Sequence, residues 1–81
     1  MKVVVKVYSG HKKIVGKNII TVTLVPGATV NNLLEELIKR YPQLAEVLGY
    51  TTISVNLHQV KQDTLLNDGD RVSLFPHIGG G

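Results

Sequence analysis

Hydrophobic side chains change their spacing twice along this chain of 81 residues, and that change limits the folds open to it. Val3, Val5 and Val7 alternate with polar neighbours, which is typical of a strand with one buried face. The same alternation returns in three later segments: 20–24, 53–57 and 72–74. Between them one stretch has the spacing of an amphipathic helix. One helix packed across one sheet is an architecture that buries both patterns.

The helical stretch has an apolar stripe at positions i, i+3, i+4, i+7, i+8 and i+11, formed by Val30, Leu33, Leu34, Leu37, Ile38 and Tyr41. We expect Thr29 to cap this helix and Pro42 to end it. Turn-forming residues fill the segment 9–18, which predicts a long loop joining strands 2–8 and 20–24 in a hairpin. A third strand, with Leu57 on its inner face, a very short strand around Val60, and a last strand over 71–75 complete a mixed sheet of four to five strands in an α+β fold.

Composition excludes several kinds of chemistry. The chain contains no cysteine, so it has no thiolate metal site, disulfide or cysteine nucleophile of its own. Its three histidines, His11, His58 and His77, stand far apart without a carboxylate at ligand spacing, and we expect surface histidines and no metal site. The pair Asp68 and Asp70 flanks one glycine, which favours a structural turn over metal ligation.

No apolar run approaches the roughly 20 residues that span a bilayer, and no signal peptide is visible. We therefore expect a soluble cytoplasmic domain without membrane association. Five of the nine Lys and Arg residues lie in the first 17, and the net charge is +3. Such a basic end suits nucleic acid or an acidic protein surface, but aromatic residues are not interleaved with the lysines, which favours a solvated face. Direct nucleic-acid binding is not expected.

Phe75 is out of phase with the buried residues of its strand. Val72 and Leu74 set the core face, so Phe75 lies on the outer face, as does Tyr8 on the first strand. If the two strands are neighbours, these rings form an exposed apolar patch of the kind that binds a protein partner. The alternative is that the tail or a loop covers Phe75.

The chain ends in Gly79, Gly80 and Gly81 after a proline at position 76. A glycine tail is narrow enough to thread into the channel of another protein, and the reactive group it presents is the carboxylate of Gly81. We therefore predict a folded domain over 1–75 and a flexible tail over 76–81. The alternative is a cloning remnant or a frayed end.

Taken together, these segments resemble the ubiquitin-like sulfur carriers typified by MoaD and ThiS, with related archaeal and eukaryotic ubiquitin-like modifiers. The matching parts are the helix start Pro26-Gly27-Ala28-Thr29-Val30 with Leu33-Leu34, the strand end Val55-Asn56, the run from Thr64 to Val72, and the closing Phe75-Pro76-His77-Ile78-Gly79-Gly80-Gly81. The tail is the most specific part, because Gly80-Gly81 falls in the register of the family's terminal pair. His77 stands where such tails usually have a second proline.

The resemblance implies a β-grasp fold with the first and last strands adjacent and parallel. It implies a carrier without catalytic residues of its own and without a bound cofactor. An activating enzyme, using ATP and magnesium, adenylates the Gly81 carboxylate, and a sulfurtransferase supplies sulfur to form a thiocarboxylate. The acceptor is an enzyme such as the large subunit of molybdopterin synthase, or one of thiamine or tRNA thiolation. The partner-binding residues would be Tyr8, Phe75 and Pro76.

Two other functions stay open at this point. Modifiers of the same group are joined to lysines through the terminal carboxylate. The TGS domain, a β-grasp module that contacts RNA, also has a Pro-Gly-Ala-Thr helix start and an Asp-Gly-Asp turn. The glycine tail favours a carrier, whereas the basic N-terminal segment favours the RNA-binding module.

Overall fold

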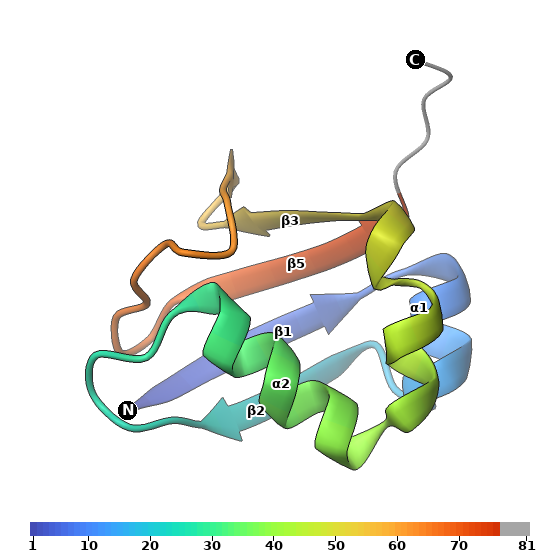
Figure 1. The fold of residues 1–81 in the computed structure, drawn as a ribbon, viewed down its shortest axis with the longest axis horizontal. Coiled ribbons are helices and arrows are strands. Elements are labelled where there is room, and N and C mark those ends of the chain that lie inside the picture. The colour runs from blue at the N-terminus through green and yellow to red at the C-terminus, as the bar shows by residue number, and fades with distance from the viewer. Residues whose placement is uncertain (77–81) are drawn as a thin grey trace.

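The computed structural model describes residues 1–76, apart from the side chain of Ser9, and residues 77–81 lie outside the described part. The elements in chain order are β1 (Lys2–Val7), α1 (Ser9–Val15), β2 (Ile19–Thr23), α2 (Val30–Arg40), the 3₁₀ turns η1 (Pro42–Glu46) and η2 (Leu48–Tyr50), β3 (Thr51–Val55), β4 (His58–Gln59) and β5 (Arg71–Pro76). The strands form one sheet in the order β2-β1-β5-β3-β4 (Figure 1).

The first and last strands lie side by side inside the sheet. β1 and β5 run parallel, with Val5 opposite Val72, whereas β2 pairs with β1 and β3 pairs with β5 in the antiparallel sense. The expected mixed sheet is therefore confirmed, as is the parallel pairing of the two terminal strands. This arrangement brings residues near the two ends of the sequence onto one surface.

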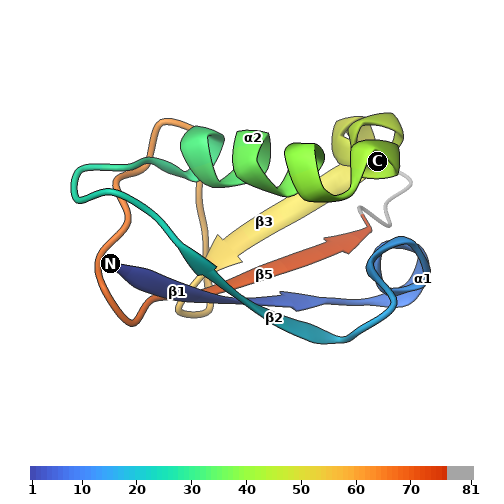
Figure 2. The same ribbon diagram turned by 90° about the horizontal axis from the view of Figure 1, so that it is seen from below.

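Helix α2 crosses one face of this sheet and leaves the opposite face uncovered in the described part of the chain (Figure 2). Its buried residues Val30, Leu33 and Leu37 pack against β-strand residues that include Val5 and Leu74. Thr29 caps the helix as expected: its hydroxyl oxygen accepts the Asn32 amide, and the Asn32 side chain accepts the Thr29 amide at 2.9 Å. The apolar side chains of the alternating strands and of the amphipathic helix are thus buried against one another in one core.

The predicted loop over 9–18 is wrong in part, because residues 9–15 form α1. No side chain caps the start of this helix, and Gly16 ends it with a left-handed φ of 82°. Helices this short are marginal in isolation, so packing against the sheet must supply its stability. Val15 and His11 are the buried side chains through which α1 packs.

The expectation that His11 lies on the surface is also wrong, because this residue is only 3% exposed. The expectation that Leu57 lies on the inner face of the third strand is wrong as well. Asn56 and Leu57 both have positive φ, 50° and 73°, and join Val55 to His58 in a two-residue hairpin turn. This turn ends β3 before Leu57 and leaves its side chain 94% exposed.

The Asn67–Asp70 turn is structural, as expected. Asp70 is buried, and its carboxylate accepts the Asn67 amide at 2.8 Å and the Asn56 side-chain amide at 3.0 Å. Asp68 accepts the backbone amide of Lys2 at 2.7 Å. These bonds tie the start of β5 to the start of β1 and to the turn after β3.

The predicted short strand around Val60 is β4, which begins two residues earlier at His58. At the other end of the sheet β5 continues through Pro76, which lies opposite Thr51. The rest of the predicted tail falls outside the described residues. Among residues 1–76 no helix has the length and apolar character that crossing a membrane requires.

Candidate functional site

The uncovered sheet face carries the two aromatic residues that strand phase placed there. Tyr8 directly follows β1 in an extended conformation, so its side chain continues the outer face even though the strand ends at Val7. Its ring meets the ring of Phe75 edge to face, with centroids 6.0 Å apart and an interplanar angle of 85°. This geometry is favourable for an aromatic pair. Tyr8 is 37% exposed and Phe75 is half-buried, so the pair remains accessible from solvent in the described structure.

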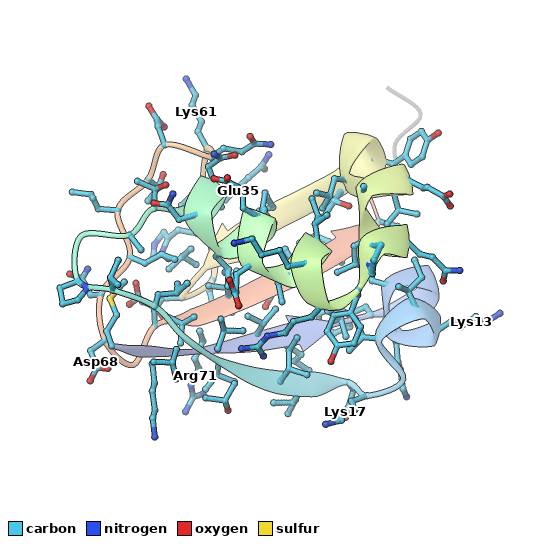
Figure 3. The ribbon with its side chains drawn as sticks, turned by 60° about the horizontal axis from the view of Figure 1, so that its bottom comes forward. Lys13, Lys17, Glu35, Lys61, Asp68 and Arg71 are labelled. Atoms are coloured by element: carbon cyan, nitrogen blue, oxygen red, sulfur yellow. The ribbon has the colours of Figure 1, made fainter. Side chains whose placement is uncertain are left out.

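Two cations adjoin this aromatic pair on the same face. The Lys6 ammonium lies 5.3 Å from the centroid of the Tyr8 ring, within the range of a cation–π interaction. Arg71 is exposed two residues before Ser73, which pairs with Lys6 in the β1–β5 register. Figure 3 shows Arg71 at the end of β5 that lies near Asp68. The face is therefore apolar at its centre and positively charged beside it.

An open depression of about 680 Å³ lies across this face. Its lining includes Val4, Lys6, Tyr8, Ile19, Leu57 and Arg71. Ile19 is 49% exposed and Leu57 is 94% exposed, so two large aliphatic side chains border the depression without being buried. The positive φ of Leu57 is uncommon for a bulky residue, and the hairpin turn that imposes it directs this side chain away from the core. We name the surface formed by Lys6, Tyr8, Ile19, Leu57, Arg71 and Phe75 the outer patch.

Strand phase predicts Tyr8 and Phe75 as partner-binding residues, and it also places Lys6 and Arg71 on the same outer face, although no binding role was expected for those two. Sequence reasoning missed the other two members of the outer patch. Ile19 stands next to the buried Ile20 at the start of β2 and has the opposite phase. Leu57 gave no signal, because the alternation of β3 continues into it and only the hairpin turn reverses its direction.

The end of β5 places the start of the tail beside this surface. Pro76 is half-buried and pairs with Thr51, one residue after Phe75. Gly79, Gly80 and Gly81 lie outside the described residues, as does His77, so the role of the Gly81 carboxylate stays a prediction. The same holds for Tyr8, Phe75 and Pro76 as partner-binding residues.

Three other lysines of the N-terminal third lie away from the outer patch. Lys12, Lys13 and Lys17 are exposed on α1 or just after it, and Figure 3 shows Lys13 and Lys17 extending from that end of the molecule into solvent. His58 is exposed, with its Nδ1 3.0 Å from the Asn56 carbonyl oxygen. Among residues 1–76 no three His, Asp or Glu side chains gather in a way that could hold a metal ion.

Comparisons with known proteins agree with this architecture. The chain is 31% identical over 83 residues to the molybdopterin synthase sulfur carrier subunit of Chlamydomonas reinhardtii, and the match covers 100% of both chains. The corresponding subunit of Mycobacterium tuberculosis is 34% identical over 55 residues, covering 68% of this chain and 66% of that protein. These relatives are sulfur carrier subunits, in agreement with the expectation of a carrier in place of an enzyme.

Solved structures show the same fold. A putative molybdopterin converting factor, subunit 1, from Pyrococcus furiosus superposes with a TM-score of 0.89 at 34% identity, covering 96% of this chain and 99% of that one. The small archaeal modifier protein SAMP1 from Haloferax volcanii has a TM-score of 0.87 at 22% identity and full coverage of both chains, which supports the ubiquitin-like β-grasp fold. The family model described as ThiS matches residues 9–81. The chain therefore belongs to the ThiS family of ubiquitin-like sulfur carriers.

Proposed function

We propose that this protein is the sulfur carrier subunit of a molybdopterin synthase and that the carboxylate of Gly81 carries the sulfur. The supporting observation is full-length similarity to a carrier subunit of that type, together with a C-terminal strand that ends beside the outer patch. The carrier needs no catalytic side chain, because the reactions take place in partners that bind the domain and reach its terminus.

The chemistry begins when the Gly81 carboxylate attacks the α-phosphate of ATP and pyrophosphate leaves. In the resulting acyl adenylate AMP is a good leaving group, whereas the oxygen of a free carboxylate is a poor one. A persulfide sulfur supplied by a sulfurtransferase then attacks the carbonyl carbon and displaces AMP. A thiol of a partner enzyme then attacks the sulfur that belongs to the persulfide's cysteine and forms a disulfide with it. The outer persulfide sulfur leaves with the bonding electron pair and remains on Gly81 as a thiocarboxylate. ATP and magnesium are bound by the activating enzyme, and this chain supplies the carboxylate and the surface that the enzyme grips.

The outer patch is the surface through which we expect the activating enzyme and the sulfur-accepting enzyme to bind. It combines an aromatic pair and two exposed aliphatic side chains with Lys6 and Arg71, so an apolar partner surface with acidic residues around it would complement it. Phe75 lies one residue before Pro76, so a partner bound there is already close to the start of the tail. A partner that binds the outer patch is therefore only a few residues along the chain from the Gly81 carboxylate.

Intact mass spectrometry tests the proposal. The protein is incubated with the cognate activating enzyme, ATP, magnesium and a persulfide source, and its mass is compared with that of a sample without ATP. We expect an ATP-dependent gain equal to the mass difference between sulfur and oxygen. A variant lacking Gly81 serves as the matched control and should stay unchanged. Isopeptide-linked conjugates in place of the thiocarboxylate would instead identify the chain as a protein modifier.

Transfer to the acceptor is a second measurement. The thiocarboxylated protein should lose its sulfur when mixed with a molybdopterin synthase large subunit and its pterin precursor. A thiocarboxylate that forms but is discharged only by a thiamine or tRNA thiolation enzyme would retain the carrier function and reassign the pathway.

A further inference from the structure

His11 is a buried titratable side chain that the proposed chemistry does not use. It extends from α1 to the start of β3, where its Nε2 lies 2.6 Å from the Thr51 hydroxyl oxygen. Only 3% of the residue is exposed. A histidine in this position links two elements that are 40 residues apart in the sequence.

The neighbouring hydrogen bonds determine which ring nitrogen carries the proton. The Thr51 hydroxyl donates its one hydrogen to the Val47 carbonyl oxygen, 2.7 Å away. It must therefore accept from His11, so Nε2 is protonated in the neutral ring and Nδ1 is not. Within residues 1–76, Nδ1 is a buried side-chain atom without a hydrogen-bond partner.

A second proton can enter the ring only at Nδ1, where the surroundings are poorly suited to a charge. Burial lowers the pKa of His11 below its ordinary value of 6.5, and the Tyr8 carbonyl oxygen offsets part of this effect. That oxygen already accepts the backbone amides of His11 at 3.0 Å and Lys12 at 3.3 Å, the first hydrogen bonds of α1. A protonated Nδ1 would compete with those amides for the same oxygen.

Charged groups from the packed elements do not account for the shift. Those elements are β1, β5 and η1, and with α1 itself they contribute the charged side chains Lys2, Lys6, Arg71, Glu46, Lys12 and Lys13. Burial lowers the pKa of His11, and the Tyr8 carbonyl oxygen opposes that effect. Glu46 is exposed on η1 and is the carboxylate nearest in sequence to Val47 and Thr51, so it is the acidic side chain that must be controlled for.

The two ends of the His11 link adjoin the outer patch. Tyr8 immediately precedes α1 and packs against Phe75, and Thr51 lies opposite Pro76 at the end of β5. Figure 1 shows α1 beside the ends of β1 and β5, near the turn that leads into β3. The same end of the sheet therefore holds the aromatic pair, the start of the tail and the histidine link.

We propose that His11 is a pH-sensitive latch and a positioning residue for this end of the sheet. In its neutral form it ties α1 to the start of β3 through Nε2. Protonation at Nδ1 keeps the Nε2 proton but places a buried charge on a nitrogen without a hydrogen-bond partner, so the charged ring moves toward water, which breaks the tie and loosens the packing of Tyr8 against Phe75. The latch needs only this chain and no partner. Only the further expectation that partner affinity falls over the same pH range rests on the proposed function.

The direction of the pH effect follows from the lowered pKa. Above pH 6.5 both folded and unfolded chains hold a neutral His11, and the latch contributes its full stability. As the pH falls below 6.5 the unfolded chain binds a proton that the folded chain resists, so the stability of the fold decreases. The stability of the fold stops decreasing once His11 is protonated in the folded chain as well.

Nuclear magnetic resonance on the isolated protein tests the latch. His58 and His77 are first replaced by glutamine, which leaves His11 as the single histidine. We expect ring nitrogen shifts of the Nε2–H tautomer at neutral pH, a titration midpoint below 6.5, and loss of the cross-peaks between Tyr8 and Phe75 as His11 titrates. A midpoint at or above 6.5, or the other tautomer, would overturn the proposal.

Substitutions in the same background separate the latch from simple packing. His11→Gln keeps a side-chain amide that can donate to Thr51 but cannot titrate, so its melting temperature and ring cross-peaks should no longer change between pH 7 and pH 5. Thr51→Val removes the hydroxyl that accepts from His11, so it should loosen the aromatic pair already at neutral pH. Thr51→Ser keeps the hydroxyl and should leave the pair intact. Glu46→Gln should retain the pH dependence. If His11→Gln retains it as well, or if Glu46→Gln removes it, His11 is not the group responsible.

Discussion

Replacing Phe75 by alanine separates the contribution of this ring to partner binding from its contribution to the fold. The ring is half-buried on the outer sheet face, where it meets Tyr8 edge to face at 6.0 Å. Its position in β5 does not depend on the side chain, because Val72 and Leu74 on the inner face are fully buried and hold the strand to the core. The substitution should therefore remove an exposed contact and leave the sheet in place.

The expected magnitudes differ for stability and for binding. Truncating a fully buried phenylalanine costs about 3–5 kcal/mol. For Phe75 we expect a loss of about 1–2 kcal/mol in the free energy of unfolding, because the aromatic pair contributes about 1 kcal/mol and burial of the ring is partial. An interface anchor costs about 2 kcal/mol or more, so affinity for the activating enzyme should fall by a factor of about 30.

Calorimetric titration against the activating enzyme and denaturant unfolding of the free protein measure the two quantities. Leu65→Ala is the matched control, because Leu65 is 63% exposed but does not belong to the outer patch. It should leave affinity unchanged. If Phe75→Ala binds normally and loses as much stability as a core substitution, the ring serves the fold and the outer patch is not the docking surface.

Three further outcomes are expected. Gly80→Val and deletion of Gly81 should each abolish ATP–pyrophosphate exchange by the activating enzyme and leave the thermal melt unchanged. The reason is that a Cβ obstructs a narrow channel and that a shortened tail leaves the carboxylate out of reach. Full exchange after the deletion would refute the carrier function. Thr29→Ala should cost about 1 kcal/mol in chemical denaturation, because it removes the hydroxyl of the capping box, whereas the exposed Thr21→Ala should cost much less. RNA binding by the exposed lysines of the α1 end, measured by fluorescence anisotropy, should be weak and fade steeply with salt; affinity that persists at moderate salt would favour the RNA-binding module.

The main elements were predictable because their signals are local. Alternating valines define β1, an apolar stripe defines α2, and Thr29 marks the start of that helix through bonds to a residue three positions away. Strand phase also placed Tyr8 and Phe75 on the outer face before their neighbourhood was known. Such features depend on side-chain period and on hydrogen bonds between near neighbours, both of which are legible in a single sequence.

Helix α1, the direction of Leu57 and the burial of His11 were decided by tertiary structure. Seven residues that begin with a serine and a glycine do not make a stable helix alone, and α1 exists because its buried side chains pack against the sheet. Leu57 continues an alternating pattern, yet the hairpin turn at Asn56 and Leu57 reverses the chain and exposes it. His11 is buried because its partner, Thr51, arrives from a distant part of the chain.

The sequence by itself determined the buried faces of β1, β2, β5 and α2 and the residue at which the main helix begins. Tertiary structure alone decided that Tyr8 and Phe75 touch, that two cations and two exposed aliphatic residues share their surface, and that a histidine ties this end of the sheet together. The physical reason is separation along the chain. Periodicity encodes the direction of a side chain, whereas the contact it makes depends on strand pairing between residues near opposite ends of the sequence.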